Sequence, residues 1–357
     1  MKTTPQLDKF LIVRLGSMGD IIHTLPAVTA LRQAFPSAEI GWIVEEKWAE
    51  LLCTLLEPRS GPRSPRRPLA DRVHTVDTKN WRNHLVSTQT WERVAASLSE
   101  LRAPAYEQAL DFQGAARSAL LARWSGAPVV WGVREPRENI ASMFYTRQVI
   151  AQGTHILEQN LSLAAGFAGR PLPVPIPDFP KDDAATKRAD DWLRANAISK
   201  FILLSPGGGW GAKQWPAERY GFVAAELAHY GVKSVVNFGP GEEDLARTLV
   251  AASSGGAISL RSSLAELIAL TRRATLFIGG DTGPMHLAAA LRVPVVAIFG
   301  PTNPARNGPY GTRNIVLRSS LSQTSHARRQ QPDPGLLQIT PDDVVAAAAK
   351  LLGGCRG

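Results

Sequence analysis

Residues 13–27, VRLGSMGDIIHTLPA, continue the apolar run FLIV and lead into a helical pattern, which predicts a strand, a glycine turn and a helix. Such a turn usually holds a phosphate, because the free N–H groups and the dipole of a helix N-terminus favour an anion. This turn ends in a carboxylate, Asp20, which repels a phosphate. Two interpretations of Asp20 stay open: a helix cap, and a general base that faces a phosphorylated substrate across a cleft.

The same turn does not fit a dinucleotide site. Gly16 and Gly19 are present, but Arg14 stands where the Gly-x-Gly-x-x-Gly fingerprint needs its first glycine. Glu45 or Glu46 stands where such a site has its ribose-binding acid. A nicotinamide-dependent oxidoreductase therefore remains an alternative, which absent NADH binding would exclude.

A second turn, SPGGGWGAKQWP (205–216), also follows an expected strand and precedes an expected helix. Gly208 and Gly209 let the backbone approach a ligand closely. Lys213 stands beside them as a cation that can neutralise a diphosphate. The alternative is a flexible loop with a solvated lysine, and the flanking Trp210 and Trp215 argue against it.

A third turn, GGDTGPMHLAAAL (279–291), repeats this layout. Asp281 or Thr282 can cap the helix, and Gly283 leaves the backbone open. The N–H groups of Thr282 and Gly283 then form an anion site. His286, one turn into the helix, can bind a phosphate oxygen, although a lone histidine there is more often structural.

The segment GPGEED (239–244) follows another expected strand. A glutamate here can accept both hydroxyls of a ribose, and we assign this contact to Glu242, with Glu243 as the alternative one position on. The alternative is that these acids lie in the first turn of a helix and complement its dipole.

Apolar runs that alternate with amphipathic segments predict parallel βαβ units, and 357 residues predict two domains. Five prolines in GRPLPVPIPDFP (169–180) favour an extended linker between them. The expected strands are residues 10–15, 40–45, 106–111, 127–133, 201–205, 234–239, 275–280 and 293–300. The expected helices are residues 19–34, 46–55, 88–102, 114–125, 216–230, 242–252, 264–272 and 284–291.

The net charge of +9 indicates an acidic partner, which leaves nucleic acid, an anionic membrane surface or a phosphorylated substrate. A nucleic-acid binder would interleave basic and exposed aromatic residues, whereas the one dense basic run is the proline-rich segment 58–72. We interpret that segment as a mobile solvated loop or as a basic arm. The two cysteines cannot form a disulfide framework or a zinc site, and the absence of long apolar runs leads us to expect a cytoplasmic protein.

The segments LIVRLGSMGDIIHTLPA, SPGGGWGAKQWP and GGDTGPMHLAAALRVPVVAIFGPT resemble the ADP-heptose:lipopolysaccharide heptosyltransferases, in order, over residues 10–310. Ser-Met-Gly-Asp and Asp-Thr-Gly-x-x-His together are specific to this family. NWR (80–82), DFQGAARSA (111–119) and RENIASMFY (137–145) look most like its heptosyltransferase I members. The chain departs from these members at Gly208 and Gly209, where they often carry hydroxyl residues. Segment 58–72 looks like an insertion, and SHARRQQPDPG (325–335) has no clear counterpart.

The resemblance implies the GT-B architecture, in which two Rossmann-like doubly wound parallel-sheet domains face each other across a cleft. It implies an acceptor domain over residues 1–172, an ADP-sugar domain over 173–340 and a C-terminal helix over 341–357 that packs back on the first domain. The implied activity is inverting, metal-independent transfer of heptose from ADP-heptose to the Kdo of the lipopolysaccharide inner core. Heptosyltransferase II, or another transferase acting on a later inner-core sugar, is the alternative.

The resemblance also assigns roles to residues. Asp20 matches the catalytic base. The donor contacts are Gly208, Gly209, Lys213, Glu242, Asp281, Thr282, Gly283 and His286. The acceptor contacts are Ser17, Met18, Gly19, Arg82, Arg117 and Arg137. No cofactor or metal is expected, and no Asp-x-Asp metal motif is present. The expected partners are ADP-heptose, Kdo-lipid A and the anionic inner-membrane surface, with no nucleic acid, and we expect a monomer.

Overall fold

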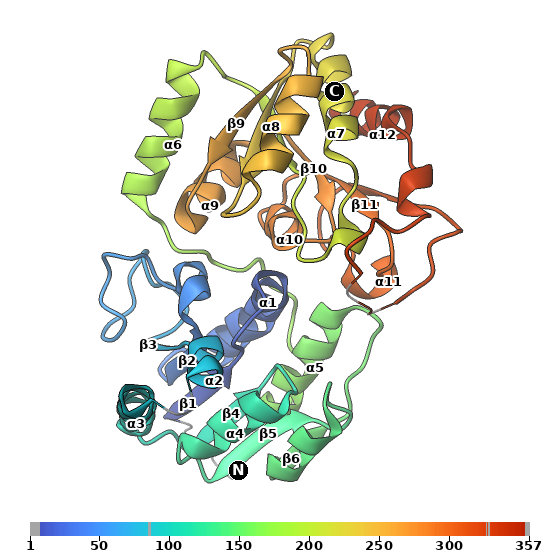
Figure 1. The fold of residues 1–357 in the computed structure, drawn as a ribbon. Helices are drawn as coiled ribbons and strands as arrows, with labels where there is room; N and C mark the ends of the chain where they lie inside the picture. Colours follow the sequence, from blue (N-terminus) through green and yellow to red (C-terminus); the bar gives the residue numbers. More distant parts are fainter. Residues whose placement is uncertain (1–7, 85–86, 326, 328, 354–357) are drawn as a thin grey trace. The chain divides into compact units, whose positions relative to one another are not determined.

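The computed structural model describes residues 8–84, 87–325, 327 and 329–353, and it divides the chain into two compact units (Figure 1). Unit 1 comprises Met1–Lys181 and unit 2 comprises Asp182–Gly357. The boundary after Lys181 lies at the end of the proline-rich linker. We expected it earlier in the linker, after residue 172. Residues 171–180 form neither helix nor strand, as the five prolines predicted.

Unit 1 contains a six-stranded parallel sheet in the order β3-β2-β1-β4-β5-β6. Its strands are β1 (Lys9–Val13), β2 (Glu39–Glu45), β3 (Arg72–Val76), β4 (Gln108–Asp111), β5 (Val129–Val133) and β6 (Arg147–Val149). Its helices are α1 (Met18–Ala34), α2 (Thr78–Asn83), α3 (Thr88–Arg102), α4 (Ala116–Trp124) and α5 (Ile156–Ala168), with 3₁₀ turns η1 (Glu46–Leu51) and η2 (Asn139–Phe144).

Unit 2 repeats this strand order within its own sheet, β12-β11-β10-β7-β8-β9, again with parallel pairs. Its strands are β7 (Phe201–Ser205), β8 (Lys233–Phe238), β9 (Ala257–Arg261), β10 (Leu276–Gly280), β11 (Val295–Phe299) and β12 (Asn314–Arg318). Its helices are α6 (Asp183–Ala195), α7 (Ala217–Ala228), α8 (Glu243–Ala252), α9 (Leu264–Arg273), α10 (Gly283–Ala290), α11 (Pro304–Asn307) and α12 (Pro341–Gly353), with η3 (Gly211–Lys213) and η4 (Leu336–Gln338).

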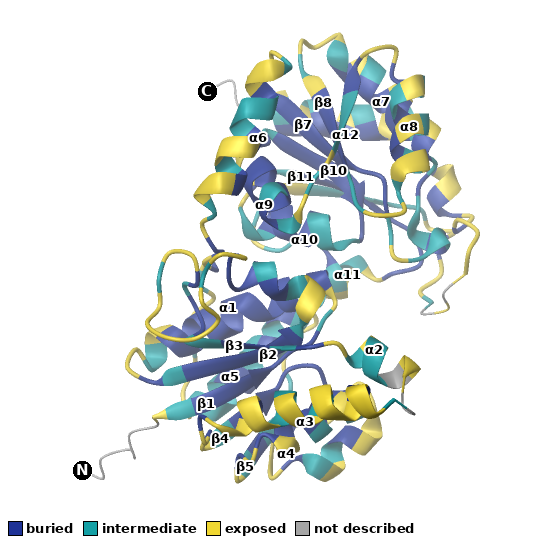
Figure 2. Cartoon of the chain, turned by 60° about the vertical axis from the view of Figure 1, so that its left-hand side comes forward, coloured by how far each residue is buried: buried dark blue, intermediate teal, exposed yellow. Residues whose placement is uncertain are grey.

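In both sheets the strand order reverses beside the first strand, between β1 and β4 and between β7 and β10. Ligands of open parallel sheets bind at this switch point, beyond the carboxyl ends of the strands. All three glycine turns of the sequence lie there, because they follow β1, β7 and β10. The central strands are buried on both faces, and Figure 2 shows them in dark blue within each unit.

The C-terminal helix α12, which we expected to pack back on the N-terminal domain, packs on the core of unit 2. Its buried face joins the hydrophobic core that also holds Trp215 and Tyr220, and it lies beside α7 (Figure 1). The segment before it is tied to the same unit, since the indole of Trp215 donates to the carbonyl of Ile339 at 3.1 Å. The buried side chains of α12 are Val344, Ala347, Ala348 and Leu351.

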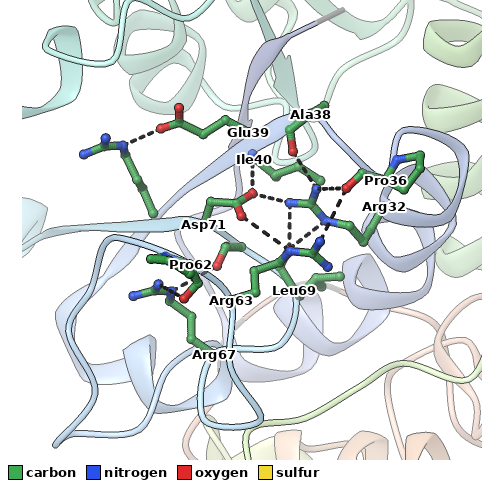
Figure 3. A network of polar contacts seen from close by, with 12 residues as sticks. Arg32, Pro36, Ala38, Glu39, Ile40, Pro62, Arg63, Arg67, Leu69 and Asp71 are labelled. Carbon is green, nitrogen blue, oxygen red and sulfur yellow. Dashed lines mark hydrogen bonds and ion pairs between the residues drawn. The ribbon is translucent and has the colours of Figure 1, made fainter.

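Segment 58–72 is a loop with internal hydrogen bonds. Its residues 58–63 are exposed, as expected of a solvated loop, and its mobility stays a prediction. Arg67 is 1% exposed and donates to the carbonyls of Gly61 and Pro62 at 2.6 and 2.8 Å (Figure 3). Arg63 pairs with Asp71 at 3.4 Å. Arg59 pairs with Glu46 on η1 at 2.5 Å. These three arginines are therefore engaged within unit 1, so they do not form the basic arm that was the second interpretation.

Where the structure describes the chain, no helix combines the length and the apolar character needed to cross a membrane.

Candidate active site

Asp20 lies in the first turn of α1, just beyond the carboxyl end of β1. Its Oδ2 accepts hydrogen bonds from the backbone N–H and the hydroxyl of Ser17, at 3.0 and 3.1 Å. Ser17 is the N-cap residue, so the two form a capping box. Asp20 therefore takes part in capping this helix, but as its third residue, because Ser17 holds the N-cap position that we considered for Asp20. The Asp20 side chain is still 37% exposed, so capping does not exclude chemistry.

Arg14 fixes the other oxygen of this carboxylate. Its Nη2 lies 2.9 Å from Asp20 Oδ1, and its side chain is only 6% exposed. Burial lowers the pKa of Arg14, and the negative charges of Asp20 and Asp111 partly offset this effect. The residue that breaks the dinucleotide fingerprint is thus a buried cation that orients Asp20. Sequence reasoning missed this role, because it read Arg14 only as an absent glycine.

The end of β4 supplies a buried acid, Asp111, which the sequence did not single out. It accepts hydrogen bonds from the Tyr145 hydroxyl at 2.8 Å and the Ser118 hydroxyl at 3.0 Å. Burial raises the pKa of Asp111, while these bonds lower it in part. Gln113 then accepts from the N–H of Leu15 at 2.9 Å. This network fixes the loop after β4 against the turn that carries Asp20.

The expected acceptor residues of unit 1 are only partly brought together. Ser17 is exposed, whereas Met18 and Gly19 are buried at the start of α1. Arg137 is exposed. Its backbone N lies close to Gly114 in the turn after β4, where an added Cβ would lie 3.0 Å from it. Arg117 on α4 donates a hydrogen bond to the hydroxyl of Thr78 on α2 at 3.2 Å. Arg82 lies in α2, and its side chain is outside the described part of the structure.

In unit 2, Lys213, Asp281 and His286 form one buried cluster at the ends of β7 and β10. Lys213 Nζ lies 2.6 Å from Asp281 Oδ2, with side chains 14% and 5% exposed. His286 Nε2 lies 3.1 Å from Asp281 Oδ1. Burial by itself raises the pKa of Asp281, but the hydrogen bond from His286 and the charges of His286 and Lys213 outweigh it and hold this pKa well below its usual range. Asp281 therefore orients Lys213 and His286 at once.

The anion site at the start of α10 has the expected geometry. Thr282 is the N-cap residue and Gly283 the first residue of the helix. Within the described residues, the backbone N–H groups of Thr282 and Gly283 donate to no protein acceptor. Lys213 lies next to them, since its Nζ also donates to the Asp281 carbonyl at 3.3 Å. Two free N–H donors, a helix N-terminus and an ammonium group thus converge, as binding of a diphosphate requires.

The glycine turn after β7 makes room for Glu242. A Cβ at Gly207 would lie 1.9 Å from Glu242 Oε1, so only glycine permits this approach. Glu242 is held there because its Oε2 accepts from the Gly239 N–H at 2.9 Å. Glu243 instead reaches Arg261 on the edge strand β9, at 4.0 Å. The two glutamates therefore point to different parts of the sheet, and Glu242 is the one at the switch point. Gly208 and Gly209 complete this turn, and a Cβ at Gly209 would meet no atom within 4 Å.

Residues 329 and 330 of the segment for which the family offered no counterpart support the Lys213 turn. The Arg329 carbonyl accepts from the Ala212 N–H at 3.0 Å. A Cβ at Gly211 would lie 1.6 Å from the Gln330 carbonyl oxygen, so the two backbones are in close contact. Nothing in the sequence pattern signalled this contact. In the described part of the chain, no group of three or more His, Cys, Asp or Glu residues is arranged to hold a metal ion.

Comparison with known proteins identifies the family. Residues 94–336 match glycosyltransferase family 9 (heptosyltransferase). The chain belongs to this family. It is therefore a glycosyltransferase, as the resemblance of its three turns implied.

Individual relatives of this glycosyltransferase agree. It is 32% identical over 320 residues to lipopolysaccharide heptosyltransferase 1 of Pseudomonas aeruginosa, covering 88% of this chain and 84% of that protein. It is 26% identical over 357 residues to lipopolysaccharide heptosyltransferase 3 of Escherichia coli, covering 94% and 95%. The solved structure of E. coli heptosyltransferase WaaC with ADP-2-deoxy-2-fluoro heptose has a TM-score of 0.74 at 28% identity, over 96% of this chain and 99% of that chain. The expected fold class, a GT-B-like fold of two doubly wound sheets, is thus confirmed.

Proposed function

We propose that this heptosyltransferase is a heptosyltransferase I, which transfers L-glycero-D-manno-heptose from ADP-heptose to the Kdo of the lipopolysaccharide inner core. The observation that carries the proposal is the carboxylate of Asp20, fixed by Arg14 and Ser17 yet 37% exposed at the end of β1. The Pseudomonas relative carries the name lipopolysaccharide heptosyltransferase 1, which supports this choice, and the structure of WaaC with an ADP-heptose analogue supports the donor.

The proposed reaction is a single in-line displacement with inversion. A hydroxyl oxygen of the acceptor forms a bond to the anomeric carbon of the heptose, and the bond from that carbon to the β-phosphate oxygen breaks. Asp20 accepts the proton of the attacking hydroxyl. ADP leaves with the bonding electron pair. Unit 1 supplies the base and the acceptor contacts, including Arg117 and Arg137, whose guanidinium groups match carboxylates and phosphates.

Unit 2 binds the donor in this proposal. Lys213 and the N–H groups of Thr282 and Gly283 stabilise the charge that develops on the leaving diphosphate. Each well-placed donor of this kind contributes about 3–4 kcal/mol to the transition state. Glu242 accepts the ribose hydroxyls, and its position beside Gly207 supports it over Glu243. We propose that no metal or other cofactor takes part, since the Lys213 ammonium group and the N–H donors already stand where a metal ion would act.

The enzyme is proposed to act as a monomer at the cytoplasmic face of the inner membrane, bound peripherally by its net charge of +9. Transfer to a later inner-core sugar is the second candidate function, because the relatives include a heptosyltransferase 3. The acceptor decides between the two.

The test is ADP release from ADP-heptose with Kdo-lipid A as acceptor, compared with the same acceptor already carrying one heptose. Asp20→Asn is the informative variant, because the amide oxygen can still accept the Ser17 N–H while the group no longer accepts a proton. We expect a loss of about 10²–10⁴-fold in rate.

Glu266→Gln is the matched control, since Glu266 completes the capping box of Ser263 on α9. It should leave the rate unchanged. Unchanged ADP release in Asp20→Asn would remove Asp20 from its role. Release only with the heptose-bearing acceptor would replace heptosyltransferase I by the second candidate.

A further inference from the structure

The 3₁₀ turn η2, between β5 and β6, presents an apolar face to solvent. Ile140 and Met143 are three positions apart and so lie on the same side of a 3₁₀ turn. They are 54% and 81% exposed. The neighbouring Ala141 and Tyr145 point inward and are 0% and 9% exposed. The side chains of Ile140 and Met143 are therefore not part of the core of unit 1. Their apolar surface stays in contact with water, which is unfavourable in free energy.

Exposed arginines flank this apolar pair in the sequence. Arg134, Arg137 and Arg147 are exposed, and none of them forms an ion pair with a carboxylate of the described residues. Residues 116–150 contain five arginines, two glutamates, and neither lysine nor aspartate. The excess of three positive charges is a third of the chain's net charge of +9, in about a tenth of its length.

The carboxylates of this segment do not neutralise it. Glu138 is occupied, because its Oε2 accepts from the Ala116 N–H at 2.9 Å. Glu135 is exposed and is the one other acid of the segment.

The η2 turn is anchored to the loop that carries the acceptor half of the site. The Glu138 N–H donates to the Gly114 carbonyl at 2.9 Å. Gly114 follows Asp111 at the end of β4, and its N–H donates to the Asp111 carboxylate at 3.2 Å. The apolar pair thus follows closely in sequence on Arg137, one of the proposed acceptor contacts.

A second exposed apolar pair in unit 1 lacks these properties. Leu55 and Leu56 are 72% and 82% exposed, as much as the pair on η2. The arginines that follow them are engaged, since Arg59 pairs with Glu46 and Arg63 with Asp71. The leucine pair is thus at least as exposed as the pair on η2, and the unpaired charge distinguishes the two places.

We propose that the η2 surface, formed by Ile140, Met143, Arg134, Arg137 and Arg147, docks unit 1 on an anionic phospholipid bilayer. The two apolar side chains enter the interface, and the arginines bind lipid phosphates from above it. The inference rests on the proposed function, because it places the acceptor-binding end of unit 1 at the membrane that holds a lipid-linked acceptor.

The test measures binding of the full chain to vesicles of phosphatidylcholine with and without phosphatidylglycerol, by co-sedimentation. Ile140→Ser/Met143→Ser should weaken binding to the anionic vesicles by about 10–100-fold, the effect of two apolar side chains. Arg134→Gln/Arg147→Gln should weaken it by about 5-fold per arginine. Leu55→Ser/Leu56→Ser is the matched control and should bind as the wild type does. All substituted side chains are exposed, and thermal unfolding checks that each variant is folded.

A second arm separates docking from catalysis. With a Kdo acceptor that lacks acyl chains, Ile140→Ser/Met143→Ser should transfer heptose at the wild-type rate, and with the lipid acceptor in vesicles it should be slower. Wild-type binding by this variant, or an equal loss in the leucine control, would overturn the proposal. Equal binding to both kinds of vesicle would also overturn it, because the arginines would then contribute nothing. If the wild type transfers no heptose, the proposed function fails while the vesicle measurement still decides the docking surface.

Discussion

The ion pair between Lys213 and Asp281 gives a prediction whose size follows from its burial. Both side chains are nearly excluded from water, and Nζ lies 2.6 Å from Oδ2. Removing one partner of a buried pair leaves an uncompensated charge, which costs about 3–5 kcal/mol. In Lys213→Met, His286 still holds the other oxygen of Asp281 at 3.1 Å, so we expect the lower end, about 3 kcal/mol. For a unit of this size that lowers the Tm of unit 2 by about 6–12 °C.

The assay is differential scanning calorimetry on four proteins, the wild type, Lys213→Met, Asp281→Asn and the double variant. Two residues in contact should show a coupling energy of about 1–3 kcal/mol, whereas independent sites add within about 0.5 kcal/mol. Lys187→Met is the matched control, because Lys187 pairs with Asp191 at the same 2.6 Å but with side chains 74% and 43% exposed. Its cost should be below about 1 kcal/mol. Additive effects of the two single variants would refute the pairing.

The pH dependence supplies an independent check of the sign. The pKa of Asp281 is lowered in the folded chain. Its contribution to stability is therefore complete above the unfolded pKa of about 3.9 and is lost as the pH falls below that value. The difference in stability between the wild type and Lys213→Met should be largest at neutral pH and shrink below about pH 4. A difference that grows in acid would contradict this assignment.

Two further predictions concern the ends of β1 and β7. Arg14→Met should lower kcat by about 10–100-fold with little change in donor KM, because Asp20 loses the cation that fixes its Oδ1, and Arg14→Lys should restore part of the rate; steady-state kinetics check this, and an unchanged kcat would contradict it. Glu242→Gln should weaken ADP binding by about 10-fold in calorimetric titration, and Glu243→Gln should not. Gly207→Ala should show the same loss of ADP affinity as Glu242→Gln while the chain stays folded. The reason is that the new Cβ would displace the Glu242 carboxylate, whose Oε1 lies 1.9 Å from that position. Full ADP affinity in Gly207→Ala would show that this carboxylate does not contact ADP.

The sequence predicted the central strands and missed the two edge strands of each sheet. Strand β7 was predicted over its exact range, and β1, β2, β4, β5, β8, β10 and β11 nearly so. The missed strands β3, β6, β9 and β12 are the edges of the two sheets. An edge strand packs on fewer neighbours, so AISLR in β9 and NIVLR in β12 end in charged residues and make no long apolar run. The signal that identifies a buried parallel strand is therefore absent where burial is incomplete.

Helices were missed or misassigned for related reasons. The range 46–55 contains apolar residues but forms the six-residue 3₁₀ turn η1, because the folded loop 58–72 begins soon after it. The sequence did not show that helix α12 packs on the core of unit 2, since an apolar stripe shows that a helix packs but not against which core. Only the contacts with α7 decide this.

The candidate site follows the same logic. Asp20, Lys213, Glu242 and Asp281 stand just after strands, and parallel strands bring their carboxyl ends to one edge of a sheet, so their grouping within each unit was predictable. The Arg14–Asp20 pair was not, since it needs the turn to fold the chain back over six residues. The contact of Gln330 with Gly211 joins segments more than a hundred residues apart, and no local pattern encodes it.

The capping box makes Asp20→Glu the sharpest separation of structure from chemistry in this site. A capping box accepts glutamate at the third helical position at least as well as aspartate, so α1 should keep its stability. The longer side chain moves the carboxylate by about 1 Å from the position that Arg14 and Ser17 fix, and a misplacement of that size can cost about 10²-fold in rate. Thermal unfolding and ADP release measured on the same preparation test both halves. A stable variant with full activity would mean that the position of this carboxylate does not matter to the reaction, and a large loss of stability would mean that Asp20 is kept for the helix and not for the proton.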